Sequence, residues 1–193
     1  MNILAIDPGT TESAYVVYDT ATMVLGDFGK VLNETMDEIV EIKADRSYCE
    51  HMAIEMPACY GMVTGQTVME TCRWVGIFQK GFGEEHTSLV YRKKRNNELG
   101  IESVTMHLCN STRAKDPNIR QAIIDKYGGE DIAIGNKKCP KCKGKGWFGS
   151  GRSVCMVCNG NQWEYPPGPL CGVTKDVWSA IAVAITFAET GQI

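Results

Sequence analysis

Three acidic residues stand at the ends of apolar segments, where together they could bind metal ions. Asp7 follows an apolar run and enters a Pro-Gly turn, Glu55 closes a second apolar run, and Asp176 precedes the apolar segment 177–188. Carboxylates that cluster repel one another and stay ionised together only when cations neutralise them. Oxygen ligands suit Mg²⁺ or Mn²⁺, and two such ions about 4 Å apart can activate water and stabilise the leaving oxygen of a phosphodiester. The three acids therefore predict a site with two Mg²⁺ or Mn²⁺ ions.

Each acid taken alone also has a structural interpretation. Asp7 could cap the amides of its turn, Glu55 could lie on the surface, and Asp176 could cap a helix, whose N-terminus favours negative charge. A carboxylate at the end of a buried strand is costly to bury unless something compensates it. The joint arrangement of the three acids favours the metal site over three separate explanations.

Four of the nine cysteines form two closely spaced pairs. Cys139-Pro-Lys-Cys142 and Cys155-Met-Val-Cys158 are separated by twelve residues. Two thiolates two residues apart can bind one metal ion from a tight turn, and two such pairs complete a tetrahedral Zn²⁺ site. Disulfides are disfavoured because the N-terminus does not resemble a secretion signal, its apolar run being interrupted by an aspartate. We expect one structural zinc ion held by the four cysteines.

Basic residues gather around the cysteine pairs and after one expected strand. The stretch 137–152 contains no acidic residue, and it carries Trp147 among its lysines. Positive charge with exposed aromatic side chains suits contact with a phosphate backbone and stacking on bases, although a solubilising charge cluster remains an alternative. The candidate DNA-binding residues are Arg92, Lys93, Lys94, Arg95, Arg113, Lys141, Lys143, Lys145, Trp147 and Arg152.

The segments that position these residues are expected to combine strands and helices. Apolar runs bounded by turn residues predict strands, and apolar residues at helical spacing predict helices. We expect strands at 2–7, 13–19, 23–29, 51–55, 87–91 and 103–108, and helices at 32–43, 65–80, 116–127 and 177–188. Asp116 followed by Pro117 is a typical helix start, and the last helix, apolar on nearly every face, should be buried. Three strands followed by strand–helix alternation predict an α/β fold with a mixed sheet flanked by helices.

Length and composition narrow the class of protein. At 193 residues, the chain can hold one domain with a sizeable core and a small additional module. The formal net charge of −3 means that a nucleic-acid surface must come from local clusters of basic residues. No apolar run reaches the ~18 residues of a membrane span. We therefore expect a cytoplasmic protein without a membrane partner.

The opening segment Asp7-Pro8-Gly9-Thr10-Thr11 resembles two families. It is similar to the first phosphate loop of actin-like and Hsp70-type ATPases, and to the first strand of RNase H-like nucleases. The ATPases need two domains that close around the nucleotide, so this chain is too short by nearly half. It also shows no second glycine-rich phosphate loop.

Further segments make the resemblance to the nucleases specific. The chain resembles RuvC-type crossover junction endonucleases, and more closely their bacteriophage-encoded branch with a CxxC…CxxC insertion. The segments that carry this resemblance are 5–14, 54–56, 106–122, 138–160 and 172–184. It implies an RNase H-like fold over 1–136 and 167–193, with a zinc-ribbon insertion at 137–166 before the last helix.

The same resemblance implies a function. The family consists of homodimeric hydrolases of DNA recombination and repair that nick opposed strands of four-way (Holliday) junctions, which for a phage protein would occur in the cytoplasm of the bacterial host. By position, Asp7, Glu55 and Asp176 would bind the metal ions. Lys115 would contact or polarise the scissile phosphate.

Two positions depart from the family pattern. RuvC proteins generally carry a second aspartate three residues after the first on the last helix, where this chain has Ser179. On a helix Ser179 still shares a face with Asp176, and it could bind metal through water. The family also commonly has a lysine where this chain has Thr105. These departures leave two alternatives open: an RNase H-like nuclease of other specificity, and a non-catalytic zinc-ribbon protein that binds branched DNA.

Overall fold

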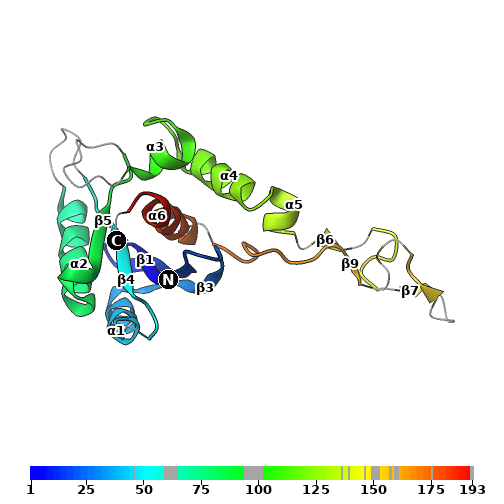
Figure 1. Ribbon diagram of the computed structural model, residues 1–193, viewed down its shortest axis with the longest axis horizontal. Helices are drawn as coiled ribbons and strands as arrows, with labels where there is room; N and C mark the ends of the chain where they lie inside the picture. The colour runs from blue at the N-terminus through cyan, green and yellow to red at the C-terminus, as the bar shows by residue number, and fades with distance from the viewer. Residues whose placement is uncertain are drawn as a thin grey trace. The chain divides into compact units, whose positions relative to one another are not determined.

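The computed structural model consists of two compact units (Figure 1). Unit 1 comprises Met1–Arg120 and Thr174–Ile193, and unit 2 comprises Gln121–Val173. The structure describes all residues except 46, 59–64, 94–101, 136, 139, 146, 149–152, 157, 159–160, 175 and 192–193.

Unit 1 is built on a five-stranded mixed sheet of strand order β3-β2-β1-β4-β5. β1 pairs antiparallel with β2 and β2 with β3, whereas β1, β4 and β5 run parallel to one another. The predicted mixed sheet flanked by helices is therefore confirmed. The elements are β1 (Asn2–Asp7), β2 (Glu12–Asp19), β3 (Leu25–Leu32), α1 (Asn33–Lys43), β4 (His51–Glu55), α2 (Gln66–Phe82), the 3-10 helix η1 (Glu84–His86), β5 (Thr87–Val90), α3 (Val104–Cys109), the first residues of α4 (Asp116–Lys126) and α6 (Val177–Thr190). The residues of α4 from Gln121 on belong to unit 2.

The two faces of the sheet are covered by different helices. Successive side chains of a strand point to opposite faces, and on one face they form a core with α1 and α2. The buried members of this core are Leu4, Ile6, Tyr15, Met36, Val40, Cys49, Met52, Ile54, Val75, Phe78 and Phe82. The opposite face is covered by α6 (Figure 1), where His51 of β4 stacks on Phe187 with ring centroids 4.8 Å apart.

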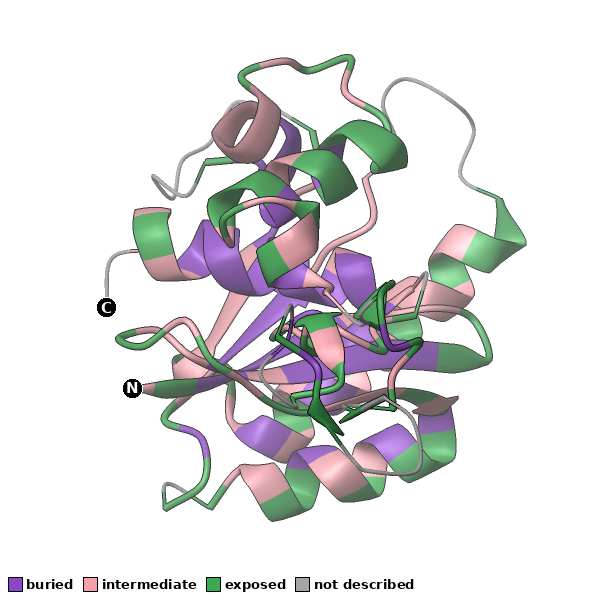
Figure 2. Cartoon of the chain, turned by 90° about the vertical axis from the view of Figure 1, so that its right-hand side faces the viewer, coloured by how far each residue is buried: buried purple, intermediate pink, exposed green. Residues whose placement is uncertain are grey.

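The last helix is buried along most of its length, as its apolar sequence predicted. Every residue of α6 from Val177 to Phe187 except Ser179 is buried. Figure 2 shows these buried residues of the helix in purple, as it does those of the sheet. A helix that is apolar on all sides cannot lie at a surface. Its burial fixes its N-terminal end, which carries Asp176 and Ser179, over the sheet.

The expected strand at 103–108 is wrong, because this segment forms the helix α3. Val104 and Thr105 are both fully buried, so burial does not alternate as it would in a strand of a two-faced sheet. Asn110 has a φ of 48° and ends the helix by donating its N–H to the Met106 carbonyl. Asparagine tolerates this left-handed conformation. The strand was predicted because apolar and polar residues alternate in this segment, which is the pattern of a strand rather than of a helix.

One strand boundary and one helix cap also differ from expectation. β3 continues to Leu32 rather than ending near residue 29. α4 begins at Asp116, as predicted, but Asp116 does not cap it, because the Lys115 carbonyl accepts hydrogen bonds from Asn118 and Ile119, and the Asn118 side chain accepts the Lys115 N–H. Lys115 is therefore the N-cap, and Asp116 is free to point its carboxylate elsewhere.

Unit 2 contains short elements around the cysteines. They are α5 (Glu130–Ala133), β6 (Lys137–Lys138), β7 (Trp147–Phe148), β8 (Ser153–Val154) and β9 (Trp163–Tyr165), with β6 paired to β9 and β7 to β8. The returning chain is fixed where Leu170 donates its N–H to the Ala133 carbonyl and Gly168 to Ile134. A side chain at Gly168 would meet the Ile132 carbonyl oxygen at 2.0 Å, so this approach requires glycine. None of the described helices is long and apolar enough to cross a membrane.

Candidate functional site

Asp7 and Glu55 lie side by side on the face of the sheet that α6 covers. β1 and β4 are parallel with Ile6 opposite Ile54, so the next residues of the two strands are Asp7 and Glu55. Because side chains alternate between faces, both carboxylates point away from the core that contains Ile6 and Ile54. They therefore meet the N-terminal end of α6, which carries Asp176.

A single row of residues crosses the sheet at this level. Asp7 pairs with Ala14 of β2, and Ala14 pairs with Lys30 of β3. On the other side, Glu55 pairs with Val90, the last residue of β5. Lys30 therefore lies at one end of this row. Arg92 follows the other end, two residues beyond Val90.

Burial and mutual repulsion make the two central acids hard to ionise. Burial raises the pKa of Asp7 to about 6, while the Arg92 charge and a hydrogen bond with Ser179 lower it and the Asp176 charge raises it further. Burial, followed by the Asp7 charge, raises the pKa of Glu55 to about 7, against the lowering effect of Arg92. Buried carboxylates that repel one another are stabilised as anions by a nearby cation.

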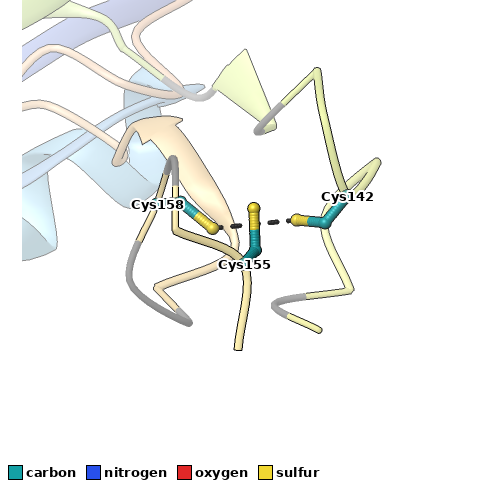
Figure 3. Close-up of side chains that lie close together, drawn as sticks. All are labelled: Cys142, Cys155 and Cys158. Atoms are coloured by element: carbon teal, nitrogen blue, oxygen red, sulfur yellow. Dashed lines mark hydrogen bonds between the residues drawn. The ribbon is translucent and has the colours of Figure 1, made fainter. Parts of the chain in front are cut away.

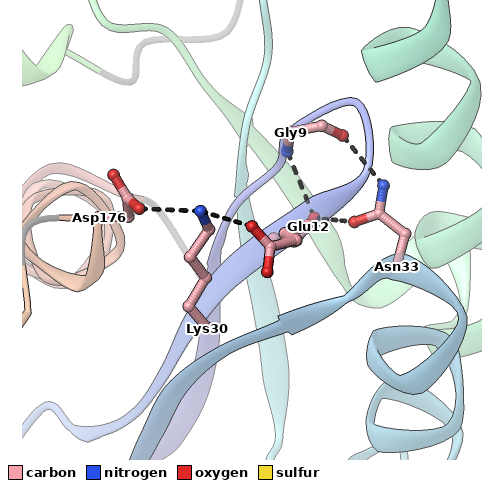
Figure 4. A network of polar contacts seen from close by, with 6 residues as sticks. Gly9, Glu12, Lys30, Asn33 and Asp176 are labelled. Atoms are coloured by element: carbon pink, nitrogen blue, oxygen red, sulfur yellow. Dashed lines mark hydrogen bonds and ion pairs between the residues drawn. The ribbon is translucent and has the colours of Figure 1, made fainter.

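The acids contact basic side chains on both sides. Arg92 forms ion pairs with Glu55, at 3.4 Å, and with Asp116 at the start of α4. Figure 4 shows Lys30 between two carboxylates, with Asp176 at 3.1 Å and Glu12 at 2.8 Å. Each basic residue thus contacts one predicted metal ligand.

The donor set of the three acids fits Mg²⁺ or Mn²⁺, which prefer oxygen ligands and accept carboxylates together with water. The oxygen atoms are spread more widely than the ligands of a closed site: among the described residues, three candidate ligand atoms within 4.8 Å of one another occur at Cys142, Cys155 and Cys158. Asp7, Glu55 and Asp176 would therefore hold ions together with water or substrate oxygens. Ser179, which stands where the family resemblance would place a further acid, lowers the pKa of Asp7 through its hydroxyl group.

A buried hydrogen-bond network fixes the turn that follows Asp7 (Figure 4). The Asn33 side chain donates to the Gly9 carbonyl at 3.1 Å and accepts from the Ser13 hydroxyl at 2.7 Å, and Ser13 accepts the Gly9 N–H at 3.3 Å. Ser13 and Asn33 are both fully buried. A side chain at Gly9 would meet the Glu12 carbonyl oxygen at 2.3 Å. The turn, and with it the direction of Asp7, is thus set by local polar contacts.

The cysteine pairs form a buried cluster in unit 2 (Figure 3). Cys142, Cys155 and Cys158 are buried, with their sulfur atoms within 4.8 Å of one another and 3.7 Å between those of Cys142 and Cys158. Cys139 lies outside the described residues. Gly144, with a φ of 78°, follows the first pair, and Lys145 donates its N–H to the Cys142 carbonyl. Thiolates at this spacing fit Zn²⁺, which takes four such ligands.

The predicted DNA-binding residues are distributed over both units. The described lysines of unit 2, Lys141, Lys143 and Lys145, are exposed, as is Trp147. Lys93, Arg113 and Lys115 of unit 1 are also exposed, whereas Arg92 turns toward the acids. Lys94, Arg95 and Arg152 lie outside the described residues.

Three residues of the site were missed by the sequence analysis. Lys30 fell just beyond the expected end of its strand, and a strand extended to the start of α1 would have included it. Asp116 was interpreted as a helix cap, which concealed its pairing with Arg92. Glu12 lies at the end of the opening turn. Because it is two residues from Ala14 on β2, the two side chains lie on the same face of the sheet, and this period of two is the signal that could have found it.

Comparison with known proteins identifies the fold. No family model matches the chain, and no curated protein matches it in sequence. Two solved structures of Thermus thermophilus RuvC are similar to it. The first is 14% identical, with a TM-score of 0.52, and the second, in complex with a Holliday junction substrate, is 13% identical, with a TM-score of 0.54. Each comparison covers 97% of this chain and 93% of the RuvC chain.

The chain has the RuvC fold. The likeness extends over nearly the whole length of both proteins. At this sequence identity, the comparison establishes the arrangement of the elements.

Proposed function

We propose that the chain is a metal-dependent, structure-selective endonuclease that hydrolyses phosphodiester bonds in four-way or other branched DNA. The observation that carries this proposal is the placement of Asp7 and Glu55 on neighbouring strands beneath Asp176, on the sheet of a RuvC fold. The known structure of Thermus thermophilus RuvC with a Holliday junction substrate supports branched DNA as the substrate class.

The residues of the site have separate tasks in this proposal. Asp7, Glu55 and Asp176 would hold two Mg²⁺ or Mn²⁺ ions, which supply a polarised water and stabilise the leaving oxygen when bound. Ser179 stabilises the ionised form of Asp7 through its hydroxyl. Lys115, exposed at the N-terminus of α4, would contact the scissile phosphate.

Binding of the DNA arms is assigned to the basic residues. A zinc ion held by the four paired cysteines would make the ribbon rigid, so that Lys141, Lys143, Lys145 and Trp147 present charge and an aromatic ring on a fixed support. Two copies of the chain would place two active sites that are related by the two-fold axis of a four-way junction. The cysteine pairs favour the phage-encoded branch of such nucleases, which acts in the cytoplasm of a bacterial host.

The test is cleavage of a synthetic four-way junction and of a linear duplex with the same arm sequence, in Mg²⁺. We expect symmetric nicks on the junction, none on the duplex, and loss of nicking in EDTA or with Asp7→Asn. Glu38→Gln is the matched control, because Glu38 is exposed on α1, which covers the opposite face of the sheet. Nicking at full rate by Asp7→Asn would refute the proposed active site.

One observation favours a second candidate function. Ser179 stands where the family generally has an acid, so the chain could bind branched DNA without cleaving it. Intact binding of the junction in a gel-shift assay, with no nicks in Mg²⁺ or Mn²⁺, would establish this alternative. Equal cleavage of junction and duplex would instead indicate an RNase H-like nuclease of other specificity.

A further inference from the structure

Arg92 is shared between one predicted metal ligand and one acid outside the metal site. Its guanidinium group contacts Glu55 through one terminal nitrogen and Asp116 through the other. The two partners differ in exposure: the Glu55 side chain is 14% exposed and that of Asp116 is 74% exposed. The guanidinium group therefore bridges the buried site and the solvent.

Lys30 makes the same arrangement on the other side of the site. Its ammonium group contacts Asp176, the third predicted metal ligand, and Glu12 at the start of β2. Figure 4 shows the ammonium group between the two carboxylates. Arg92 follows β5 and Lys30 belongs to β3, the two edge strands of the sheet. Unrelated parts of the chain thus build the same three-group pattern twice.

A divalent ion bound by the predicted ligands would repel both basic side chains. Like charges a few ångströms apart oppose each other, strongly at the buried Glu55 and more weakly at the exposed Asp176, so the guanidinium and ammonium groups would both be driven from the ligands. Each basic side chain already contacts a second carboxylate, Asp116 for Arg92 and Glu12 for Lys30. It would therefore keep an ion-pair partner after it moved away from the metal ligand. We call Asp116 and Glu12 the outer acids.

We propose that Arg92 and Lys30 are internal counter-cations that a bound divalent ion displaces from the predicted metal ligands, and that the outer acids hold them after displacement. The inference rests on the proposed function, since it requires that the three acids bind metal. The two basic residues act on the metal ligands, and the outer acids act on the basic residues. All four are therefore positioning residues, because none of them acts on the substrate.

The charge of Asp116 would also affect cation binding directly, without Arg92. A nearby negative charge favours cation binding, and a nearby positive charge disfavours it, whatever the contacts between them. Asp116 is mostly exposed, where water and salt screen such a direct effect. If its effect passes through Arg92, it disappears when Arg92 is replaced, whereas a direct effect of its charge remains. A double-mutant cycle measures this difference.

The experiment is Mn²⁺ binding by electron paramagnetic resonance, on the full chain without DNA, at one pH and ionic strength. We expect Asp116→Asn to weaken binding by at least about threefold and Arg92→Gln to tighten it. In the Arg92→Gln background, Asp116→Asn should change affinity by less than about twofold. Asp125→Asn is the matched control: the same substitution on the same helix, about 14 Å further along it, is expected to leave affinity unchanged.

The outcomes separate the inference from the proposed function. Equal weakening by Asp116→Asn in both backgrounds overturns the inference and leaves the metal site intact. Absence of Mn²⁺ binding, or binding to Asp7→Asn as tight as to the wild type, refutes the metal site and the inference with it. If Arg92→Gln does not fold, the cycle of Lys30→Gln and Glu12→Gln tests the same scheme, because both side chains are at least 37% exposed.

Discussion

Asn33→Ala should destabilise the fold by breaking two buried hydrogen bonds. The Asn33 amide makes two hydrogen bonds inside the protein, to the Gly9 carbonyl and from the Ser13 hydroxyl. Asn33 and Ser13 are fully buried, so water cannot replace the lost partner without rearrangement. A buried polar group left without a partner costs about 1–3 kcal/mol. Two such groups predict a loss of about 2–6 kcal/mol, a large part of the about 5–15 kcal/mol typical of a domain.

The assay is urea unfolding followed by far-UV circular dichroism, with zinc held constant. Asn118→Ala is the matched control, because its side chain is exposed and accepts a single N–H, from Lys115. The control should lose no more than about 1 kcal/mol, as is typical for a helix-start contact. Ser13→Ala combined with Asn33→Ala should lose less than the sum of the single variants, because either change alone already breaks their shared bond.

The same substitution should also weaken metal binding at Asp7. The network fixes the turn that begins directly after this residue, so its loss leaves the carboxylate less well positioned. A loss of stability below about 1 kcal/mol for Asn33→Ala, no larger than that of its control, would refute the reasoning, because the network would then contribute no more than an exposed contact.

Two further predictions concern unit 2. Cys155→Ser should lower the zinc content from one ion per chain to a small fraction, because three thiolates hold zinc much less tightly than four. Metal analysis of the purified variant measures this content. Retention of more than half an equivalent of zinc would contradict the zinc site. Replacing Lys141 and Lys143 together by Gln should weaken junction binding and reduce the slope of log affinity against log salt by about 2, if each lysine contacts one phosphate. The same change at Lys80, exposed on α2, should leave the slope unchanged, and a slope unaffected by the double substitution would show that these lysines do not contact DNA.

The sequence predicted the sheet well because each of its strands carries a strong local signal. β1 and β4 are short apolar runs stopped by proline-containing turns, and α6 is apolar on nearly every face. Apolar runs of this kind arise because the segments are buried, and the hydrophobicity of the residues shows this burial directly in the sequence. The helix α3 was missed because its residues alternate in polarity like a strand, and its end depends on the left-handed conformation of Asn110.

The candidate site was predicted in part, for the same physical reason. Asp7 and Glu55 end apolar strands, and the period of two along a strand places both on one face. Lys30 and Asp116 lack such a signal, since their roles arise from pairing across the sheet and from the approach of α4. Contacts between distant segments depend on register, and register was not determined by the local pattern.

The serine at position 179 is compatible with an active site because of the charges around it. Its hydroxyl hydrogen-bonds Asp7 and lowers the pKa of that buried carboxyl, which favours the anion that a metal ion requires. A carboxylate in the same place would repel Asp7 and raise this pKa further. Asp7 and Glu55 already repel each other, with Arg92 beside them as the counter-charge. A neutral donor therefore lowers the pKa of the first predicted metal ligand without adding a further charge to balance, so a serine at this position is compatible with metal binding.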